Sequence, residues 1–156
     1  MAQMKILFLD IDGVLNNTRT LLRGWEEFDE DAIQNLGDIL RQTRARIVLS
    51  STWRKYPTQK RNFGRMLVKY KLIQFWGGDT TPIILGTARA IEIQQWLDEN
   101  ANIERFAILD DDMDAAMEAE NGKFFRTNYQ DGLTQEIASK VIAFLNDSSK
   151  QTKEAE

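Results

Sequence analysis

Acidic residues directly follow two short apolar segments of the chain, residues 5–9 and 105–109. The five carboxylates at these positions belong to Asp10, Asp12, Asp110, Asp111 and Asp112. Successive side chains of an extended backbone alternate in direction, so Asp10 and Asp12 point to the same side. Carboxylates that converge on one crevice repel one another unless a cation or a proton is shared among them. This pattern predicts a site for a cation.

The composition restricts the chemistry that these carboxylates can take part in. The chain has no cysteine and no histidine. Disulfides, thiolate metal sites, cysteine nucleophiles, the serine triad and the usual ligands of zinc and non-haem iron are therefore excluded. Catalysis must use carboxylates, hydroxyls, Lys or Arg, or a hard metal ion bound through oxygen. Octahedral Mg²⁺ with several waters suits this set of groups.

Segments of two kinds alternate along the chain. Short apolar runs predict strands at 5–9, 45–49, 105–109 and 123–127, with a brief further strand at 73–76. Apolar residues at helical spacing predict helices that start near Asp29 or Asp31, Pro57, Thr87 and Thr134. This order favours an α/β protein with a doubly wound, Rossmann-like three-layer fold and a mostly parallel sheet. In such sheets the ligand crevice lies beyond the carboxyl ends of the strands.

The length of 156 residues fits one domain. We expect this domain to span residues 1–146 and to be followed by a polar, frayed tail over 147–156. The most apolar stretch near the start, 4–15, is interrupted by Lys5, Asp10 and Asp12, so it cannot form a membrane span or the core of a signal peptide. The sequence therefore predicts a cytoplasmic protein without a membrane partner.

Charge is distributed unevenly along the chain. Residues 39–78 contain ten of the twenty basic residues and no acidic residue, although the net charge of the whole chain is -4. This asymmetry indicates a basic face beside an acidic one, which suits an anionic ligand next to a metal site. A solvated helix face in an otherwise acidic chain is the alternative interpretation.

Residues 7–15, with the sequence LFLDIDGVL, resemble the DxDGxL motif that comes first in the haloacid dehalogenase-like (HAD) hydrolase superfamily. The later motifs follow in the order of that superfamily. Residues 48–50 resemble the second motif, Arg89 supplies the basic residue before the fourth, and 108–111 resemble the fourth. A longer match, with LDIDGVLN, LSSTWR, RxxEIxxWL and ILDDD, is similar to the HAD-like domain associated with Swiss Army Knife RNA repair proteins.

The resemblance implies an uncapped phosphatase that works through an aspartyl-phosphate intermediate. Asp10 would attack phosphorus in line, and Asp12 would protonate the leaving oxygen and then deprotonate the water that breaks the acyl phosphate. Mg²⁺ would bind Asp10, the backbone carbonyl of Asp12 and Asp111, and would cancel the repulsion between the two anions. Asp110 would make a hydrogen bond or an outer-sphere contact.

Four further residues are expected near the phosphoryl group. Ser50 would donate a hydrogen bond to the phosphoryl oxygens, and Ser51 is the alternative, since only one of two adjacent side chains can point into the site. Arg89 would balance the phosphoryl charge, a role that the superfamily more often gives to Lys, or it is a helix-surface residue. Arg54 either holds a second phosphate or is a surface charge.

Other acidic metal sites fit the sequence less well. In an EF-hand, Gly13 would be misplaced and Leu21 would occupy the position of the bidentate Glu. A signalling receiver domain has an adjacent acidic pair after the first strand and a lone aspartate after a later one, which reverses the order found here. A haloacid dehalogenase needs only the first aspartate, so Asp12 and the acidic fourth motif favour phosphoryl transfer.

The substrate prediction depends on the short segments 16–28 and 77–86, neither of which can hold a folded cap domain. An uncapped crevice is open to large substrates, and together with the basic segment it favours a phosphorylated RNA or DNA end. One alternative is a phosphatase of small phosphorylated metabolites or nucleotides. An alternative of another class is a non-catalytic nucleic-acid-binding module, supported by the aromatic residues interleaved with basic ones in 39–78.

Overall fold

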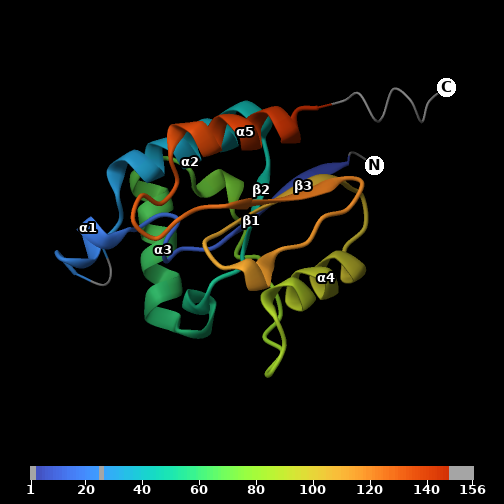
Figure 1. Cartoon of the computed structure of the whole chain (residues 1–156), viewed down its shortest axis with the longest axis horizontal. Helices are drawn as coiled ribbons and strands as arrows, with labels where there is room; N and C mark the ends of the chain where they lie inside the picture. Colours follow the sequence, from blue (N-terminus) through green and yellow to red (C-terminus); the bar gives the residue numbers. More distant parts are fainter. Residues whose placement is uncertain (1–2, 25–26, 148–156) are drawn as a thin grey trace.

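Four parallel strands form the central sheet of the computed structural model, which describes residues 3–24 and 27–147 (Figure 1). The strands run in the order β2-β1-β3-β4, with β1 at Met4–Leu9, β2 at Arg46–Leu49, β3 at Ile103–Asp110 and β4 at Gly122–Arg126. Leu9, the last residue of β1, pairs with Leu49 of β2 and Leu109 of β3. The carboxyl ends of these three strands therefore lie side by side.

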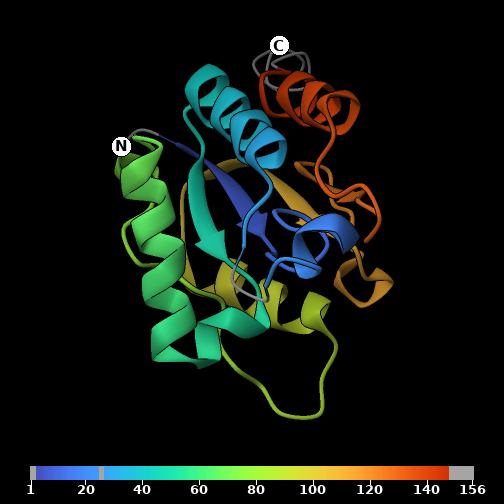
Figure 2. The same cartoon turned by 90° about the vertical axis from the view of Figure 1, so that its left-hand side faces the viewer.

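Helices cover both faces of the sheet (Figures 1 and 2). The helices are α2 (Glu30–Thr43), α3 (Pro57–Lys69) and α5 (Gln135–Leu145) on one face and α4 (Arg89–Glu99) on the other. Leu7 and Leu9 point into the core beneath α2, α3 and α5, whereas Ile6 and Phe8 point toward α4. Both sides of β1 are buried, which explains its uninterrupted apolar run. The three layers confirm the predicted parallel α/β fold.

The helices on the first face begin at the signals that the sequence contains. The Asp29 side chain caps α2 by accepting a hydrogen bond from the Asp31 amide at 3.1 Å. Pro57 occupies the first position of α3, where its missing N–H costs nothing. The Thr134 hydroxyl caps α5 by accepting from the Ile137 amide at 3.3 Å. Local capping chemistry therefore fixes where these helices start.

The prediction of a strand at 73–76 is wrong. Ile73–Phe75 forms a short 3-10 helix, η2, in which the Phe75 amide donates to the Leu72 carbonyl at 3.0 Å. Leu72 and Phe75, three residues apart, are both buried. That spacing places them on one side of a tight helical turn, whereas a strand would point them in opposite directions.

The start of the helix predicted at Thr87 is also wrong. α4 begins two residues later, at Arg89. The Thr87 hydroxyl donates to the Ile84 carbonyl at 2.9 Å, so Thr87 stabilises a turn that precedes the helix instead of capping the helix itself.

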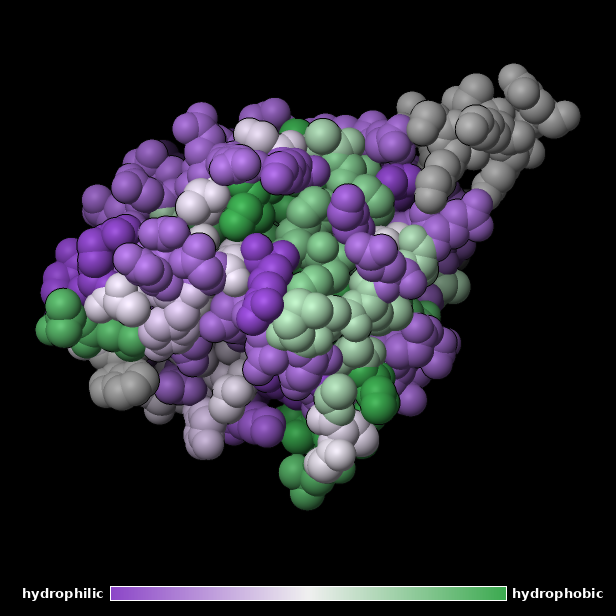
Figure 3. All heavy atoms as spheres, viewed as in Figure 1, coloured by the Kyte–Doolittle hydropathy of each residue, from purple (hydrophilic) through white to green (hydrophobic). Residues whose placement is uncertain are grey.

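Short segments that the sequence did not predict follow the strand ends. They are α1 (Thr18–Leu21), η1 (Thr52–Lys55) and η3 (Met113–Ala115). Among the described residues of 16–28, α1 is the one helix, and 77–86 contains none, so neither holds a folded cap. The 77–88 segment projects at the bottom of the molecule, where Figure 3 shows hydrophobic residues at its tip and where Ile83 and Leu85 are exposed.

The 77–88 segment is fixed to the sheet beside β2. The Leu49 amide donates to the Asp79 carbonyl at 2.9 Å, and the Thr81 amide donates to the Leu49 carbonyl at 3.1 Å. These two bonds extend the sheet by one parallel bridge. The segment therefore starts from a defined position next to the carboxyl end of β2.

No helix in the described part of the chain combines the length and the apolar character needed to cross a bilayer. Residues 148–156 of the predicted tail lie outside the described residues.

Candidate active site

Three carboxylates meet where β1 and β3 end. One oxygen each from Asp10, Asp110 and Asp111 lies within 4.8 Å of the others. Asp10 and Asp110 are buried, and Asp111 is half-buried. The pairing of Leu9 with Leu109 brings the ends of the two strands together, so the acidic residues after each strand share one site. We call these three residues the carboxylate cluster.

Burial makes the cluster unfavourable for two negative charges. Burial, followed by the charge of Asp110, raises the pKa of Asp10 well above its ordinary value, although Arg89 opposes this in part. Burial also raises the pKa of Asp110 to about 6, although a hydrogen bond from the Asp112 amide at 3.0 Å favours its charged form. A proton or a cation shared by these carboxylates would relieve the repulsion between them.

The donor set of the cluster fits a hard cation. It consists of carboxylate oxygens, the ligands that Mg²⁺ prefers. Gly13, with φ +81°, makes room for one of them, because a Cβ atom there would lie 2.4 Å from Asp111 Oδ2. Only glycine at this position lets the Asp111 carboxylate approach the chain that follows β1. The residues present therefore fit the predicted ion.

Asp12 lies next to the cluster, and its side chain has separate partners. Asp12 Oδ1 accepts hydrogen bonds from Asn16 Nδ2 at 2.8 Å and from Trp53 Nε1 at 3.2 Å. The Asn16 amide oxygen in turn accepts from the Gly13 amide at 2.8 Å. Two donors on Oδ1 fix the orientation of this carboxylate and leave Oδ2 as its second oxygen.

Sequence reasoning missed three residues at this edge. Asn16 and Trp53 lie inside the LDIDGVLN and LSSTWR segments, and that position was the only signal that could have indicated them. Tyr129 is the third: burial, together with the charges of Asp12 and Asp111, raises the pKa of its hydroxyl. No sequence pattern links Tyr129 to the first motif.

The two adjacent serines at the end of β2 differ in their hydrogen bonds. Ser51 Oγ accepts from the Trp53 amide at 3.2 Å and caps η1. Ser50 Oγ is buried and has no hydrogen-bond partner among the described residues. Thr81 Oγ1 is buried without a partner in the same way, but Ser50 lies at the carboxyl end of β2, where a ligand of a parallel sheet binds. Ser50 therefore has a free donor at the strand end.

Arg89 reaches the same strand end from the start of α4. Its Nη1 donates to the Ser50 carbonyl at 2.5 Å, and its charge opposes the rise in the pKa of both Asp10 and Asp110. Glu92 lies one turn along the helix, with Oε1 4.0 Å from Arg89 Nε. The guanidinium of Arg89 is therefore close enough to the carboxylate cluster to act on it electrostatically.

Arg54 is buried, and most of its guanidinium is bound within the protein. Nη2 lies 2.8 Å from Glu92 Oε1, and three backbone carbonyls also accept from the group. Those carbonyls belong to Ser51, Thr81 and Pro82, at 2.7, 3.2 and 3.2 Å. Burial lowers the pKa of Arg54, and Glu92 opposes that shift. These contacts join η1 to the 77–88 segment. Binding of a second phosphate by Arg54 stays a prediction.

A parallel α/β sheet with aspartates at the ends of two adjacent strands is the arrangement of a HAD-type hydrolase domain. The family model for the HAD domain in Swiss Army Knife RNA repair proteins matches residues 6–138. Because this match covers most of the chain, the chain belongs to that family, and the resemblance predicted from the motifs is confirmed. No curated protein and no solved structure matches the chain.

Proposed function

We propose that this domain is a Mg²⁺-dependent phosphatase that works through an aspartyl-phosphate intermediate and acts on phosphorylated nucleic-acid ends. The buried cluster of Asp10, Asp110 and Asp111 is the observation that supports the proposal. Its excess of negative charge calls for a cation, and HAD-type hydrolases place such a cation beside a nucleophilic aspartate. A phosphate ester is a substrate on which a cation and a nucleophilic aspartate can act together.

Each proposed step assigns one group to one bond. An Asp10 carboxylate oxygen attacks phosphorus, and the bond from phosphorus to the ester oxygen breaks while that oxygen takes a proton from Asp12. A water molecule then attacks the aspartyl phosphate, gives its proton to Asp12, and releases inorganic phosphate with Asp10 restored. When bound, Mg²⁺ supplies positive charge that allows the anionic nucleophile to approach the anionic phosphate.

Two groups are suited to hold the phosphoryl oxygens. Ser50 Oγ has a hydroxyl proton that no described residue accepts. Arg89 supplies positive charge from the side of α4. Asp12 is positioned for its proton transfer because Asn16 and Trp53 both bind Oδ1, so Oδ2 is the oxygen left to exchange the proton.

A nucleic-acid end is proposed as the substrate for three reasons. The family description refers to RNA repair proteins. The described segments near the strand ends contain no cap that would restrict the crevice to small molecules. Residues 39–78 contain ten basic and no acidic residues, and this segment includes Ser50 and Ser51. A polyanion is attracted to such a surface.

The test is phosphate release with Mg²⁺ from 3′- and 5′-phosphorylated RNA and DNA oligonucleotides, with mononucleotides and an aryl phosphate measured beside them. Asp10→Asn serves as the blank, and Asp112→Asn, at an exposed neighbouring aspartate, is the matched control. We expect Asp10→Asn to lower turnover by at least about a thousandfold without lowering the unfolding temperature. Asp112→Asn is expected to retain activity.

Each result has one meaning. Turnover retained in Asp10→Asn would remove the proposed nucleophile. Release from small phosphates alone would keep the chemistry and exclude the nucleic-acid substrate. No release from any substrate, with oligonucleotide binding intact, would favour the non-catalytic binding module.

A further inference from the structure

A groove runs along the outer side of α3, between that helix and η2. Its volume is about 700 Å³. One end is formed by η1, through Arg54 and Lys55, and the other by Ile73 and Trp76. Its lining residues on α3 run from Pro57 to Val68, and a helix of the length of α3 spans about 20 Å, so the groove follows most of the helix.

The floor of the groove is apolar and partly exposed to solvent. Val68 is 60% and Ile73 is 40% exposed, a large fraction for two branched aliphatic side chains on adjacent elements. Two contacts hold the half-buried Trp76 ring in place. The Phe63 ring packs edge-on against it, with the ring centroids 4.9 Å apart, and Trp76 Nε1 donates to the Asp79 carbonyl at 3.0 Å. A fixed, partly exposed indole is a platform on which a flat ring can stack.

The rim of the groove is basic throughout. Lys55, Lys60, Arg61 and Arg65 line it, and none of these four side chains has an ion pair in the described part of the chain. No acidic residue of the described ranges 3–24 and 27–147 lines the groove. Unpaired cations above an apolar floor match a ligand with regularly spaced negative charges and flat apolar faces.

A larger cavity on the other side of α3 lacks this match. Its volume is about 950 Å³, and it is lined by three basic residues, Arg23, Arg65 and Lys69, together with four acidic residues. Those residues are Glu27, Asp29, Glu30 and Asp31. Their charges repel a polyanion, so we assign the ligand to the smaller, wholly basic groove.

The short helix η1 contributes residues to the groove and also contacts residues of the site. Within that short helix, Trp53 donates to Asp12 Oδ1 and Arg54 donates to the Ser51 carbonyl. Residues of η1 therefore contact both the groove and the strand end at which phosphate would be held.

We infer that the α3 groove binds a single-stranded polynucleotide whose phosphorylated end enters the site at Asp10. Phosphates of the strand contact Lys60 and Arg61, and bases lie against Trp76 and Ile73. The inference rests on the proposed function, since it extends the substrate of the same site beyond the reacting phosphate. It also separates recognition of the strand from the chemistry at its end.

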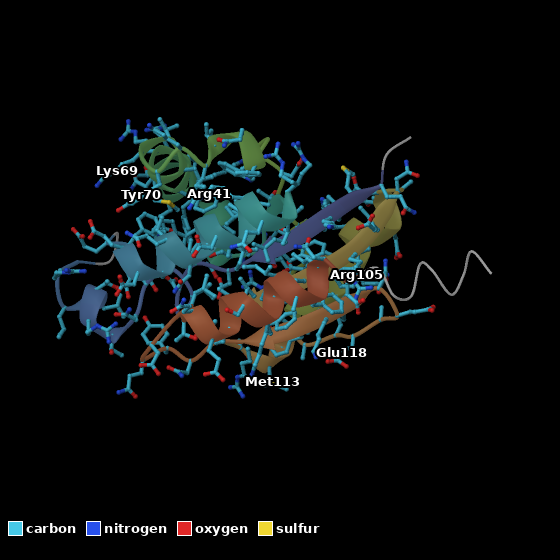
Figure 4. The ribbon with its side chains drawn as sticks, turned by 90° about the horizontal axis from the view of Figure 1, so that it is seen from above. Arg41, Lys69, Tyr70, Arg105, Met113 and Glu118 are labelled. Atoms are coloured by element: carbon cyan, nitrogen blue, oxygen red, sulfur yellow. The ribbon has the colours of Figure 1, made fainter. Side chains whose placement is uncertain are left out.

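The test compares charge reversals at the groove with charge reversals outside its lining. Lys60→Glu/Arg61→Glu changes the rim, and Lys69→Glu/Lys71→Glu makes the same change in charge at two residues that do not line the groove. Figure 4 shows Lys69 near the end of α3 on the side of Tyr70. Lys69 and Tyr70 both line the larger cavity on the other side of the helix. Binding of an unphosphorylated fluorescent oligonucleotide, measured by anisotropy in an Asp10→Asn background, does not depend on turnover.

We expect the Lys60/Arg61 variant to bind the oligonucleotide about 10- to 100-fold more weakly and with a smaller dependence on salt. The Lys69/Lys71 variant should stay within about threefold of the parent. Equal weakening in both variants would show a general charge effect and overturn the groove assignment. Polyglutamate that competes as well as the oligonucleotide at equal charge would also overturn it, in favour of an acidic protein partner.

A second readout separates this inference from the proposed function. In the otherwise native chain, the Lys60/Arg61 variant should lose about tenfold in kcat/KM on a phosphorylated oligonucleotide and nothing on an aryl phosphate. Equal kcat/KM values of the Lys60/Arg61 variant and the native chain on the oligonucleotide would overturn the groove assignment without affecting the proposed phosphatase activity. If the native chain hydrolyses neither substrate while oligonucleotide binding still depends on Lys60 and Arg61, the groove is supported as the binding site and the proposed phosphatase activity is refuted.

Discussion

Two groups of buried charged side chains lie beside each other in this domain, and they differ in how their charges are compensated. In the first, Glu92 lies between Arg54, at 2.8 Å, and Arg89, at 4.0 Å. In the second, Asp10 and Asp110 are buried with Asp111 beside them; Arg89 acts electrostatically on Asp10 and Asp110, and Arg54 interacts more weakly with Asp10. The first group is compensated within the protein, whereas the second has more negative charge than its surroundings balance.

This difference separates a structural network from a ligand site. Buried charges that find partners in the chain hold elements together, here η1, the 77–88 segment and α4. Buried charges of one sign raise the free energy of the fold unless a ligand neutralises them. Both groups look alike as charged residues in a sequence, and only their partners tell them apart.

The largest expected effect on stability is that of Glu92→Gln. Glutamine keeps the shape and an acceptor for the Ile84 amide, 2.9 Å from Glu92 Oε2, but removes the charge that balances Arg54. We expect the free energy of unfolding to fall by about 3 kcal/mol, measured by urea denaturation. The control is Glu136→Gln, whose exposed pair with Lys140 should contribute less than about 0.5 kcal/mol. Equal losses would mean that the first group is not a structural network.

Gly13→Ala should disturb the second group without disturbing the first. Its Cβ would lie 2.4 Å from Asp111 Oδ2 and would displace that carboxylate. We expect phosphate release to fall about 100-fold. Gly86→Ala is the matched control, because Gly86 has a similar φ of +77° and no atom within 4 Å of an added Cβ. Similar activity losses in the two variants would attribute the effect to backbone strain alone.

Asp110→Asn should stabilise the metal-free protein at neutral pH. The pKa of Asp110 is raised from 3.8 to about 6 in the folded protein. The stability that this raised pKa contributes is therefore fully present below pH 3.8 and is lost as the pH rises through 6. In EDTA at pH 7.5, the variant should be more stable by on the order of 1 to 3 kcal/mol, and the difference should shrink toward pH 4. A variant less stable than the parent at pH 7.5 would contradict uncompensated repulsion in the cluster.

The two serines give the smallest and most specific comparison. Ser50→Ala removes a hydroxyl that no described residue binds, so stability should change by less than about 0.5 kcal/mol while phosphate release falls about tenfold. Ser51→Ala removes the cap on the Trp53 amide and should lower stability by about 1 kcal/mol with activity near that of the parent. The reverse pattern would make Ser51 the phosphate ligand.

The sequence was sufficient for features that depend on local patterns. Apolar runs of strand length and the rule that ligands bind at the carboxyl ends of parallel strands predicted the meeting of Asp10 with Asp110 and Asp111. The caps at Asp29 and Thr134 were likewise local. Features that depend on long-range contacts were out of reach, because no local pattern specifies which partner a side chain finds.

Two residues and one segment illustrate that limit. Glu92 looks like an ordinary helix acid, yet it is buried against Arg54, thirty-eight positions away in the sequence. Trp53 reaches Asp12 only because β2 pairs beside β1. Tertiary packing also decided the conformation of 73–76, where burial of Leu72 and Phe75 together produced a helical turn.

Calorimetric titration of Mg²⁺ into the metal-free protein tests whether the carboxylate cluster binds a divalent cation. We predict one site at pH 7.5, with an affinity that falls as the pH drops through about 6 because protons compete for Asp110. Asp111→Asn should bind at least about tenfold more weakly, whereas Asp112→Asn should match the parent. Equal binding by the Asp111→Asn variant, or no Mg²⁺ binding by the parent protein, would show that the carboxylate cluster is not a divalent-cation site.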